Sequence, residues 1–344
     1  MKAEPVSLSS RLKTVRGARS LPARLVRDLL GGVTGPLARE SRLVRTGIAR
    51  YEAMAGQHAA HYQLRRHVHM IEKGLTMQPR RPVFALDYIV STVRSYVSLR
   101  RDGEGVLGKD EVLWMHSVLA DYFDATRAAG DPVLAGLEPE FQEASADLVG
   151  ERSSGPHRPD TTTPSVASDD LVALARRRRS VRWFEPRPVP REVVDIAVSV
   201  AMEAPTACNR QPYRFVVFDD PESVRRVASV PMGTRGYAHQ LTGIIVVVGD
   251  MSAFFDARDR HLIYVDASLA ATGLLLGFES QGVGTCVINW PDMPEKELEM
   301  RDLLGLAPHE KTIMLVAFGY PDPEGLVPFS AKADLDAVRV YEAL

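Results

Sequence analysis

The sequence predicts a layered α/β or α+β domain preceded by a mainly helical region, on three observations. Apolar residues recur at helical spacing between about residues 51 and 149. Residues 153–168 are rich in Pro, Gly and Thr, and from Asp169 onward helical patterns alternate with short apolar runs. We therefore expect a basic N-terminal arm (1–50), a helical domain (51–152), a linker (153–168) and a C-terminal domain (169–344).

The composition excludes several classes of protein. The chain has 344 residues, of which 45% are hydrophobic and 25% are charged, and its net charge is −2. This near-neutral balance gives no overall attraction to nucleic acid, so no nucleic-acid partner is expected. The two cysteines, Cys208 and Cys286, are too few for a disulfide-dense scaffold or a four-cysteine zinc site. We expect a cytoplasmic protein, because the N-terminus also lacks the continuous apolar core of a secretory signal.

The N-terminal arm has its own character. Residues 1–50 carry eleven Arg or Lys, at the positions 2, 11, 13, 16, 19, 24, 27, 39, 42, 45 and 50, with few acids. Leu21, Leu25, Leu29 and Leu30 recur at helical spacing, which suits an amphipathic helix on a membrane surface or against a protein partner. A helix that packs on its own protein with a solvated basic face explains the same pattern, and both interpretations stay open.

The elements of the C-terminal domain follow in order. Ser168 is expected to cap a first helix, and Pro190 to occupy the first turn of a second helix. Strands are expected at 214–218, 243–249, 284–289 and 312–318, and the second is typical of a strand buried on both faces. A long helix is expected at 262–281 and an acid-rich one at 295–304. Asp266 interrupts the apolar run of the long helix, which favours a buried helix of a soluble protein over a membrane span.

Three segments could carry chemistry. The first is the basic run from Arg176 to Arg182, at the end of a predicted helix, where guanidinium groups suit a phosphate and Ser180 can add a hydrogen bond. A merely solvated basic helix end is the alternative. The second is the loop 203–215, in which small residues let backbone amides approach a ligand, and Asn209 and Gln211 both donate and accept hydrogen bonds.

The third segment is the turn and strand at 282–291, whose glycines permit a tight turn and whose Asn289 could face a ligand at the end of the strand. It lacks the third glycine and the following helix of a dinucleotide fingerprint. Cys208 is not expected to be a nucleophile, because no partner histidine is identifiable.

The order of these segments resembles the FMN-dependent nitroreductase family. The resemblance rests on Arg-Arg-Ser-x-Arg-x-Phe (178–184), Pro-Thr-Ala-Cys-Asn-Arg-Gln-Pro (205–212), the long helix from Asp266, Gly-Val-Gly-Thr-Cys (282–286) and Phe-Gly-Tyr-Pro (318–321). It covers residues 169–344. It implies an α+β fold with a mixed sheet flanked by helices, and a homodimer with FMN in the dimer interface.

The resemblance also implies the roles of individual residues. Arg178, Arg179 and Ser180 would hold the FMN phosphate and ribityl chain, supported by Arg182. The flavin would be lined by Pro205, Thr206, Ala207, Asn209 and Gln211, contributed by the partner subunit. Ile288, Asn289 and Trp290 would place a backbone amide near the reactive flavin nitrogen, and Lys332 is the candidate for a basic residue after the Gly-Tyr-Pro.

A string in the helical domain, 67–77, resembles nitroreductase-like proteins encoded with bacterial polysaccharide-biosynthesis genes. His67, His69 and Glu72 could suggest a metal, but histidines two residues apart do not share a helix face, so no metal is expected. We interpret Glu72-Lys73-Gly74 as a helix C-terminus, with Gly74 in the left-handed conformation and Lys73 at the negative end of the helix dipole.

The function expected from the residues and the resemblance is a homodimeric oxidoreductase that takes hydride from NAD(P)H onto FMN and reduces a small organic acceptor, in cell-envelope or polysaccharide metabolism. Two alternatives stay open: a protein that binds or sequesters flavin without catalysis, and an oxidase or dehydrogenase of the same fold.

Overall fold

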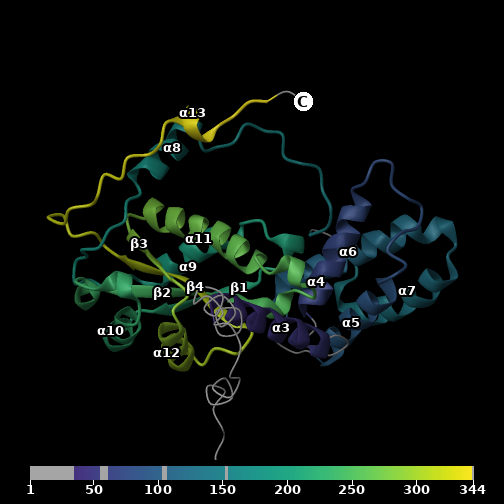
Figure 1. Cartoon of the computed structure of the whole chain (residues 1–344). Coiled ribbons are helices and arrows are strands. Elements are labelled where there is room, and N and C mark those ends of the chain that lie inside the picture. The colour runs from purple at the N-terminus through teal and green to yellow at the C-terminus, as the bar shows by residue number, and fades with distance from the viewer. Residues whose placement is uncertain (1–34, 55–60, 103–106, 152–153, 343–344) are drawn as a thin grey trace, which may run out of the picture. The chain divides into compact units, whose positions relative to one another are not determined.

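The computed structural model describes residues 35–54, 61–102, 107–151 and 154–342 (Figure 1). The chain divides into two compact units, 1–43 and 44–344, and helix α3 (Pro36–Met54) begins in the first. The leucines predicted to form an amphipathic helix, Leu21 to Leu30, lie outside the described residues. The expected linker boundary at 153–168 stays a prediction.

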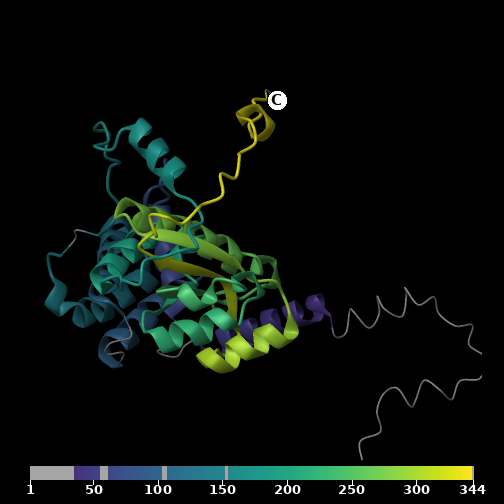
Figure 2. The ribbon, with the colours of Figure 1, turned by 90° about the vertical axis from the view of Figure 1, so that its left-hand side faces the viewer.

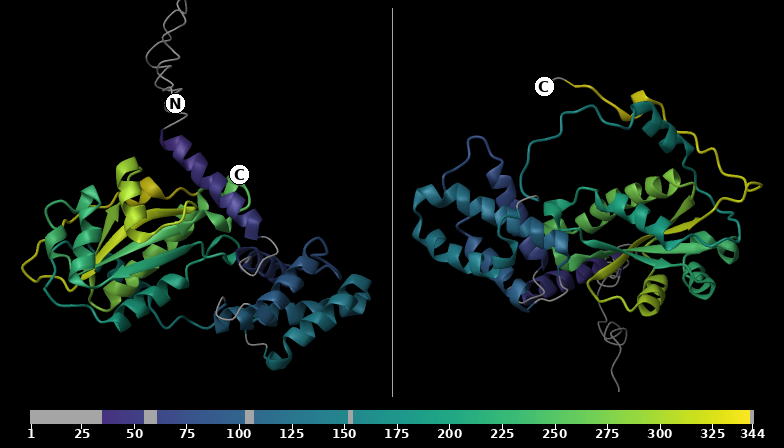
Figure 3. Two further views of the ribbon diagram at one scale, coloured as in Figure 1. Left: turned by 90° about the horizontal axis from the view of Figure 1, so that it is seen from below. Right: turned by 180° about the vertical axis from the view of Figure 1, so that it is seen from behind.

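The helical region is a small bundle with its own core (Figure 3). It contains α4 (His61–Leu75), α5 (Ile89–Asp102), α6 (Lys109–Thr126) and α7 (Pro132–Ala144). Val68, Tyr96, Leu119 and Tyr122 are among its fully buried side chains. Burial of this apolar stripe from each helix stabilises the bundle.

The prediction for Gly74 is wrong. Helix α4 continues through Gly74 and ends at Leu75, so Gly74 does not terminate the helix in a left-handed conformation. A Cβ atom at Gly74 would lie 2.3 Å from a ring carbon of Phe84. The glycine therefore permits close packing of an aromatic ring, while Lys73 does lie in the last turn as expected.

The C-terminal domain contains a four-stranded antiparallel sheet in the order β1-β2-β4-β3. Its strands are β1 (Tyr213–Phe218), β2 (Gly243–Asp250), β3 (Gly284–Asn289) and β4 (Glu310–Gly319), so all four predicted strands are present. Among the described residues, parallel pairing is confined to an isolated bridge between Ser180 and Thr285. That bridge adds one parallel pairing beside four strands that all pair antiparallel.

Helices cover both faces of the sheet (Figures 1 and 2). Helices α9 (Arg191–Met202) and α11 (Leu262–Ser280) lie on one face, and α10 (Pro221–Ser229) and α12 (Pro294–Leu304) on the other. Every residue of β2 from Gly243 to Gly249 is buried, as expected of a strand covered on both sides. The α+β layered fold is confirmed.

Two helix starts differ from the sequence prediction. Helix α8 (Ser168–Arg177) includes Ser168 as its first residue, and Ala167 is the N-cap, so the Ser168 hydroxyl makes no capping hydrogen bond. Asp169 and Asp170 instead favour this helix start through the helix dipole. Pro190 is the N-cap of α9 rather than its first-turn residue, because its ψ of 144° is extended.

Close packing of α11 on α9 depends on small residues. A Cβ atom at Gly273 would lie 2.9 Å from the Val200 carbonyl oxygen, and one at Gly277 would lie 2.8 Å from Ala197 Cα. The segment 257–280 is long and apolar enough to cross a membrane by length and composition, with 44% of its most apolar window buried inside the protein. Its contacts with α9 and the sheet are those of a core helix.

Helix α8 and the segment after β4 contrast with this core, because they bury almost nothing. No residue of α8 is buried. The segment 320–342, which runs from β4 to α13 (Leu335–Val338) and beyond, exposes Leu326, Phe329, Val338 and Tyr341 by 72% or more (Figure 2).

The surroundings of two helical glycines predict opposite effects of substitution by alanine. Gly277→Ala should lower the free energy of unfolding by about 1–3 kcal/mol, because the new methyl group meets backbone atoms. Gly136→Ala, in α7, should raise it by about 0.5–1 kcal/mol, because nothing lies within 4 Å of the new methyl and alanine favours a helix. Urea denaturation measures both, and a Gly277→Ala protein as stable as wild type would contradict the packing.

Candidate functional site

The basic run after α8 is fixed beside strand β3. The Val181 N–H donates to the Thr285 carbonyl oxygen at 2.9 Å, and Ser180 forms the parallel bridge with Thr285. The Arg179 guanidinium donates to the carbonyls of Arg176 and Arg178, and Arg182 lies over the Tyr237 ring, 5.9 Å from its centroid. Arg178, Arg179, Ser180 and Arg182 are therefore held at one edge of the sheet.

This edge carries an excess of positive charge. Arg177 forms an ion pair with Glu279 at 3.0 Å, and burial raises the pKa of Glu279 although Arg177, Arg178 and Arg179 lower it. In the described part of the chain, no carboxylate lies within ion-pair distance of Arg178, Arg179 or Arg182. Several guanidinium groups beside a single carboxylate favour an added anion such as a phosphate monoester.

The loop from Pro205 to Pro212 has an unusual backbone. Cys208, Asn209 and Gln211 have φ angles of 54°, 51° and 51°, in the left-handed region that non-glycine residues rarely adopt. Such a conformation persists only where surrounding contacts fix it. Strained backbone of this kind is common at ligand sites, which agrees with the expectation for this loop.

Side chains from within the loop and from α11 fix its conformation. The Gln211 N–H donates to Thr206 Oγ1 at 3.1 Å, and the Ala207 N–H donates to Asp266 Oδ2 at 3.1 Å. Asp266 is 2% exposed, and its burial raises the pKa of the carboxyl to about 6, partly offset by the Ala207 amide and Arg210. Asp266 thus connects the core helix to the loop.

Helix α4 holds the same loop from the helical region. Arg65, which is 6% exposed, donates from Nε to the Asn209 carbonyl oxygen at 2.7 Å and forms an ion pair with Glu111. Its guanidinium lies 5.5 Å from the Trp114 ring centroid, and the Trp114 indole donates to Glu72. A buried charge with these partners fixes the position of Asn209.

The end of β3 places its side chains mainly in the core. Ile288 and Trp290 are 2% and 8% exposed, and the Trp290 indole N–H donates to Glu297 at 2.9 Å. The Asn289 side chain is exposed. Only backbone groups and the Asn289 amide are therefore available to a ligand at this strand end, in line with the predicted role of a backbone amide.

Lys332 is not brought to the other predicted residues. It lies in the exposed segment between β4 and α13, and no hydrogen bond or ion pair joins it to another described residue. Its predicted contact with a ligand stays a prediction.

The histidines of α4 do not form a metal site. His67 is buried, its Nδ1 lies 3.2 Å from Thr92 Oγ1, and burial followed by Arg66 and Arg210 lowers its pKa to about 4. His69 instead contacts Glu72 at 3.3 Å. Among the described residues, no group of three potential metal ligands occurs.

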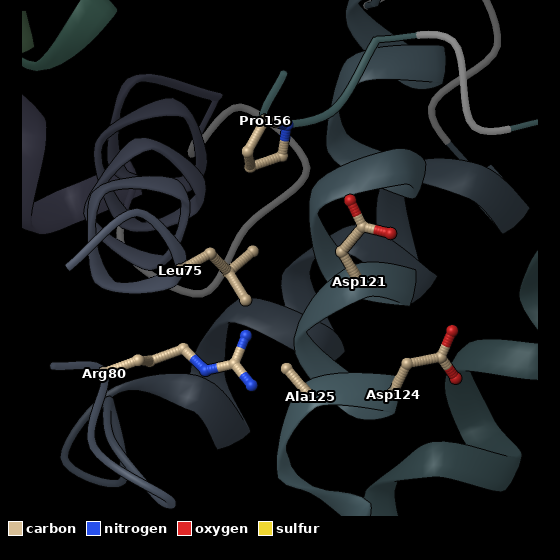
Figure 4. A pocket seen from close by; sticks show the side chains of 6 residues that line it. All are labelled: Leu75, Arg80, Asp121, Asp124, Ala125 and Pro156. Carbon is tan, nitrogen blue, oxygen red and sulfur yellow. The ribbon is translucent and has the colours of Figure 1, made fainter. Parts of the chain in front are cut away.

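Two pockets in the helical region are separate from these residues. One, of about 390 Å³, is lined by Leu75, Arg80, Asp121, Asp124, Ala125 and Pro156, with the Arg80 guanidinium directed toward the α6 side (Figure 4). The other, of about 270 Å³, lies between α6 and α7. None of the residues predicted to contact a flavin lines either pocket.

Comparison with known proteins gives a family match. Residues 175–235 and 233–320 match the model of the Nitroreductase family. The match lies in the C-terminal half of the chain.

Relatives include iodotyrosine deiodinase 1 of Pongo abelii, which is 24% identical over 269 residues, covering 70% of this chain and 90% of that protein. An NADH dehydrogenase of Thermus thermophilus is 28% identical over 187 residues, covering 45% of this chain and 89% of that protein. A solved structure of an FMN-dependent nitroreductase from Clostridium difficile is 21% identical, covers 50% of this chain and 99% of its own, and has a TM-score of 0.44.

Sequence reasoning missed two residues that fix the loop 205–212 of the candidate site. Asp266 was noted as an interruption of an apolar helix, and a lone carboxylate in a buried helix already signals a specific partner. Arg65 gave no signal, because its partners Asn209 and Glu111 are distant in sequence.

The raised pKa of Asp266 predicts a pH-dependent effect of Asp266→Asn. The pKa of the wild-type carboxyl is 3.8 in the unfolded chain and is raised to about 6 in the folded protein. The stability that the neutral carboxyl contributes is therefore fully present below pH 3.8 and is lost as the pH rises through 6. The asparagine variant does not titrate. From pH 4 to pH 7 its unfolding free energy should therefore rise relative to wild type, by up to about 3 kcal/mol.

Denaturation at several pH values measures this difference, and a constant difference would refute it. Asp220→Asn is the control, because hydrogen bonds from Ser223 lower the pKa of Asp220 below 3.8 and place its titration outside this window.

Proposed function

We propose that this chain is an FMN-dependent oxidoreductase that takes hydride from NAD(P)H and passes electrons to a small organic acceptor. The observation that carries the proposal is the surplus of guanidinium groups at Arg178, Arg179 and Arg182. Their forks suit the FMN phosphate, and Ser180 can add a hydrogen bond.

The loop 205–212 fits the polar part of a flavin. The buried Tyr213 hydroxyl beside it has no hydrogen-bond partner among the described residues. Such a group is normally satisfied, so it supports a bound ligand. Asn209 and Gln211 supply side-chain amides that can match the donors and acceptors of a flavin ring.

Bound FMN would supply the redox chemistry, and the protein would supply binding and orientation. The arginines would hold the phosphate end and the strained loop the polar ring edge. Asp266 keeps the Ala207 amide in place rather than facing a substrate, since its Oδ2 already accepts that N–H. We assign no side chain as general acid or base.

We propose a homodimer of this chain. Several large apolar side chains of α9 and α11 are exposed: Ile196, Val200 and Met202 on α9, and Val265 and Leu269 on α11. Exposed apolar surface of this kind is typical of a protein interface. Helix α8 has ten residues and none buried, and a helix this short is marginal in water without packing. A second copy would cover both features.

The acceptor and the setting are the finer parts of the proposal. We propose a cytoplasmic enzyme, and cell-envelope polysaccharide metabolism as its setting, on the string 67–77 alone. In the structure this string is explained by packing: His67, Val68 and Ile71 are buried in the bundle. The relatedness to iodotyrosine deiodinase extends over 70% of the chain, beyond the family-model match, so iodotyrosine belongs among the acceptors to test.

The decisive measurement is the visible spectrum of the purified protein before and after anaerobic NADH or NADPH. We expect flavin absorption bands that bleach with one nicotinamide and recover on addition of a nitroaromatic or iodotyrosine acceptor. Bands that neither nicotinamide bleaches would indicate flavin sequestration or a flavin reduced by its own substrate. A colourless protein that does not bind added FMN would refute the proposal.

Arginine variants connect this spectrum to the site. Arg178→Gln with Arg179→Gln should weaken FMN binding about 10-fold or more and leave binding of riboflavin, which lacks the phosphate, little changed. Arg176→Gln, in the same basic run, is the matched control and should retain FMN affinity. Equal loss of FMN and riboflavin would argue against a phosphate role.

The dimer proposal predicts the effect of Leu269→Glu. A charge in the apolar surface of α11 should convert a dimer to monomer in sedimentation experiments and reduce the bound flavin, because an unpaired charge is costly to bury. Leu298→Glu, on α12 and 59% exposed in wild type, should leave the assembly intact. A monomeric wild-type protein would overturn the proposal.

A further inference from the structure

Two arginines from distant segments approach one pair of aromatic residues. Arg210, in the loop 205–212, lies 5.0 Å from the ring centroid of Phe254, and Arg66, on α4, lies 4.9 Å from that of Phe255. Tyr51 packs on the same Phe255 ring with a centroid distance of 5.9 Å. Arg66, Arg210 and this aromatic group therefore share one region, which we call the Arg66–Arg210 site.

Arg210 is almost completely buried, yet its hydrogen-bonding capacity is not satisfied. It is 3% exposed, it donates from Nη1 to the Ala207 carbonyl oxygen at 3.3 Å, and its buried Nε has no hydrogen-bond partner among the residues that the structure describes. A buried guanidinium normally has a carboxylate or several acceptors, because removing its charge from water is costly. Its environment is thus incomplete without an anion.

The charges around Arg210 do not supply that anion. Within the described residues, no carboxylate lies at ion-pair distance from Arg66 or Arg210. Arg258 contacts the same Phe255 ring at 5.3 Å, but it ion-pairs with Asp256 and Asp259. Burial lowers the pKa of Arg210, and Arg66 lowers it further, while Cys208, Asp259 and Tyr51 oppose this. Arg210 also lowers the pKa of Asp266, but Asp266 Oδ2 accepts the Ala207 N–H and is not at ion-pair distance from Arg210.

We propose that Arg66 and Arg210 bind the carboxylate of an organic acid, and that this acid is the electron acceptor. Two guanidinium groups supply charge-assisted hydrogen bonds to the oxyanion, and the rings of Phe255 and Tyr51 supply an apolar wall for its organic part. The link to the acceptor rests on the proposed function, because Arg210 lies between Asn209 and Gln211 of the loop assigned to the flavin.

The binding test uses benzoate and its neutral isostere benzamide as probes, titrated calorimetrically into the full-length protein with and without FMN. We expect benzoate to bind at least about 10-fold more tightly than benzamide. Arg66→Gln and Arg210→Gln should each weaken benzoate about 10-fold or more. Arg258→Gln is the matched control, because Arg258 shares the ring but is already paired, and its benzoate affinity should stay within about twofold.

Arg66→Gln keeps the test valid if the buried Arg210 variant does not fold, since Arg66 is only half-buried. Undetectable benzoate binding, equal affinity for benzamide, or an equal loss in the Arg258→Gln control would each overturn the proposal. Because titration needs no turnover, this result is independent of whether the protein proves to be an oxidoreductase.

Turnover tests the second half of the proposal. With FMN-loaded enzyme, the ratio of kcat/KM for 4-nitrobenzoate over 4-nitrobenzamide should exceed one, and it should fall about 10-fold in Arg66→Gln. If Arg66→Gln weakens benzoate binding but leaves this ratio of kcat/KM values unchanged, the anion bound at the Arg66–Arg210 site is not the acceptor.

Discussion

The left-handed backbone at Cys208, Asn209 and Gln211 is the constraint on which the site depends. Each such residue costs on the order of 1–3 kcal/mol, which other contacts must offset. The hydrogen bonds that fix the loop come from three places: Thr206 within the loop, Asp266 on α11 and Arg65 on α4. The position of Asp266 depends in turn on Gly273 and Gly277, which seat α11 against α9.

Much of the fold could be predicted from the sequence, because local patterns carry it. The apolar run at 243–249 and the residues 284–289 mark β2 and β3. The chemistry of the segments that contain Arg178 and Asn209 is also visible in the sequence, and both segments lie within the family match. Their contact with a ligand stays a prediction.

The remainder could not be predicted because it is set by contacts between distant residues. Gly74 has the sequence context of a helix end, yet Phe84 decides its role by packing on it. Arg65 and Asn209 are 144 positions apart, and no local pattern joins them. The resemblance predicts that Ile288 and Trp290 place a backbone amide, and it does not indicate that both side chains are buried in the core.

The bond between Arg65 and the Asn209 carbonyl makes the helical bundle and the loop thermodynamically linked. A change that shifts α4 alters the free energy of the loop conformation, and by reciprocity a ligand that orders the loop also orders α4. Residues 61–75 therefore belong to the same cooperative unit as the loop, although the family match begins a hundred residues later. In evolutionary terms, α4 and the loop should change together, and grafting either one onto a related protein would transfer only half of a coupled pair.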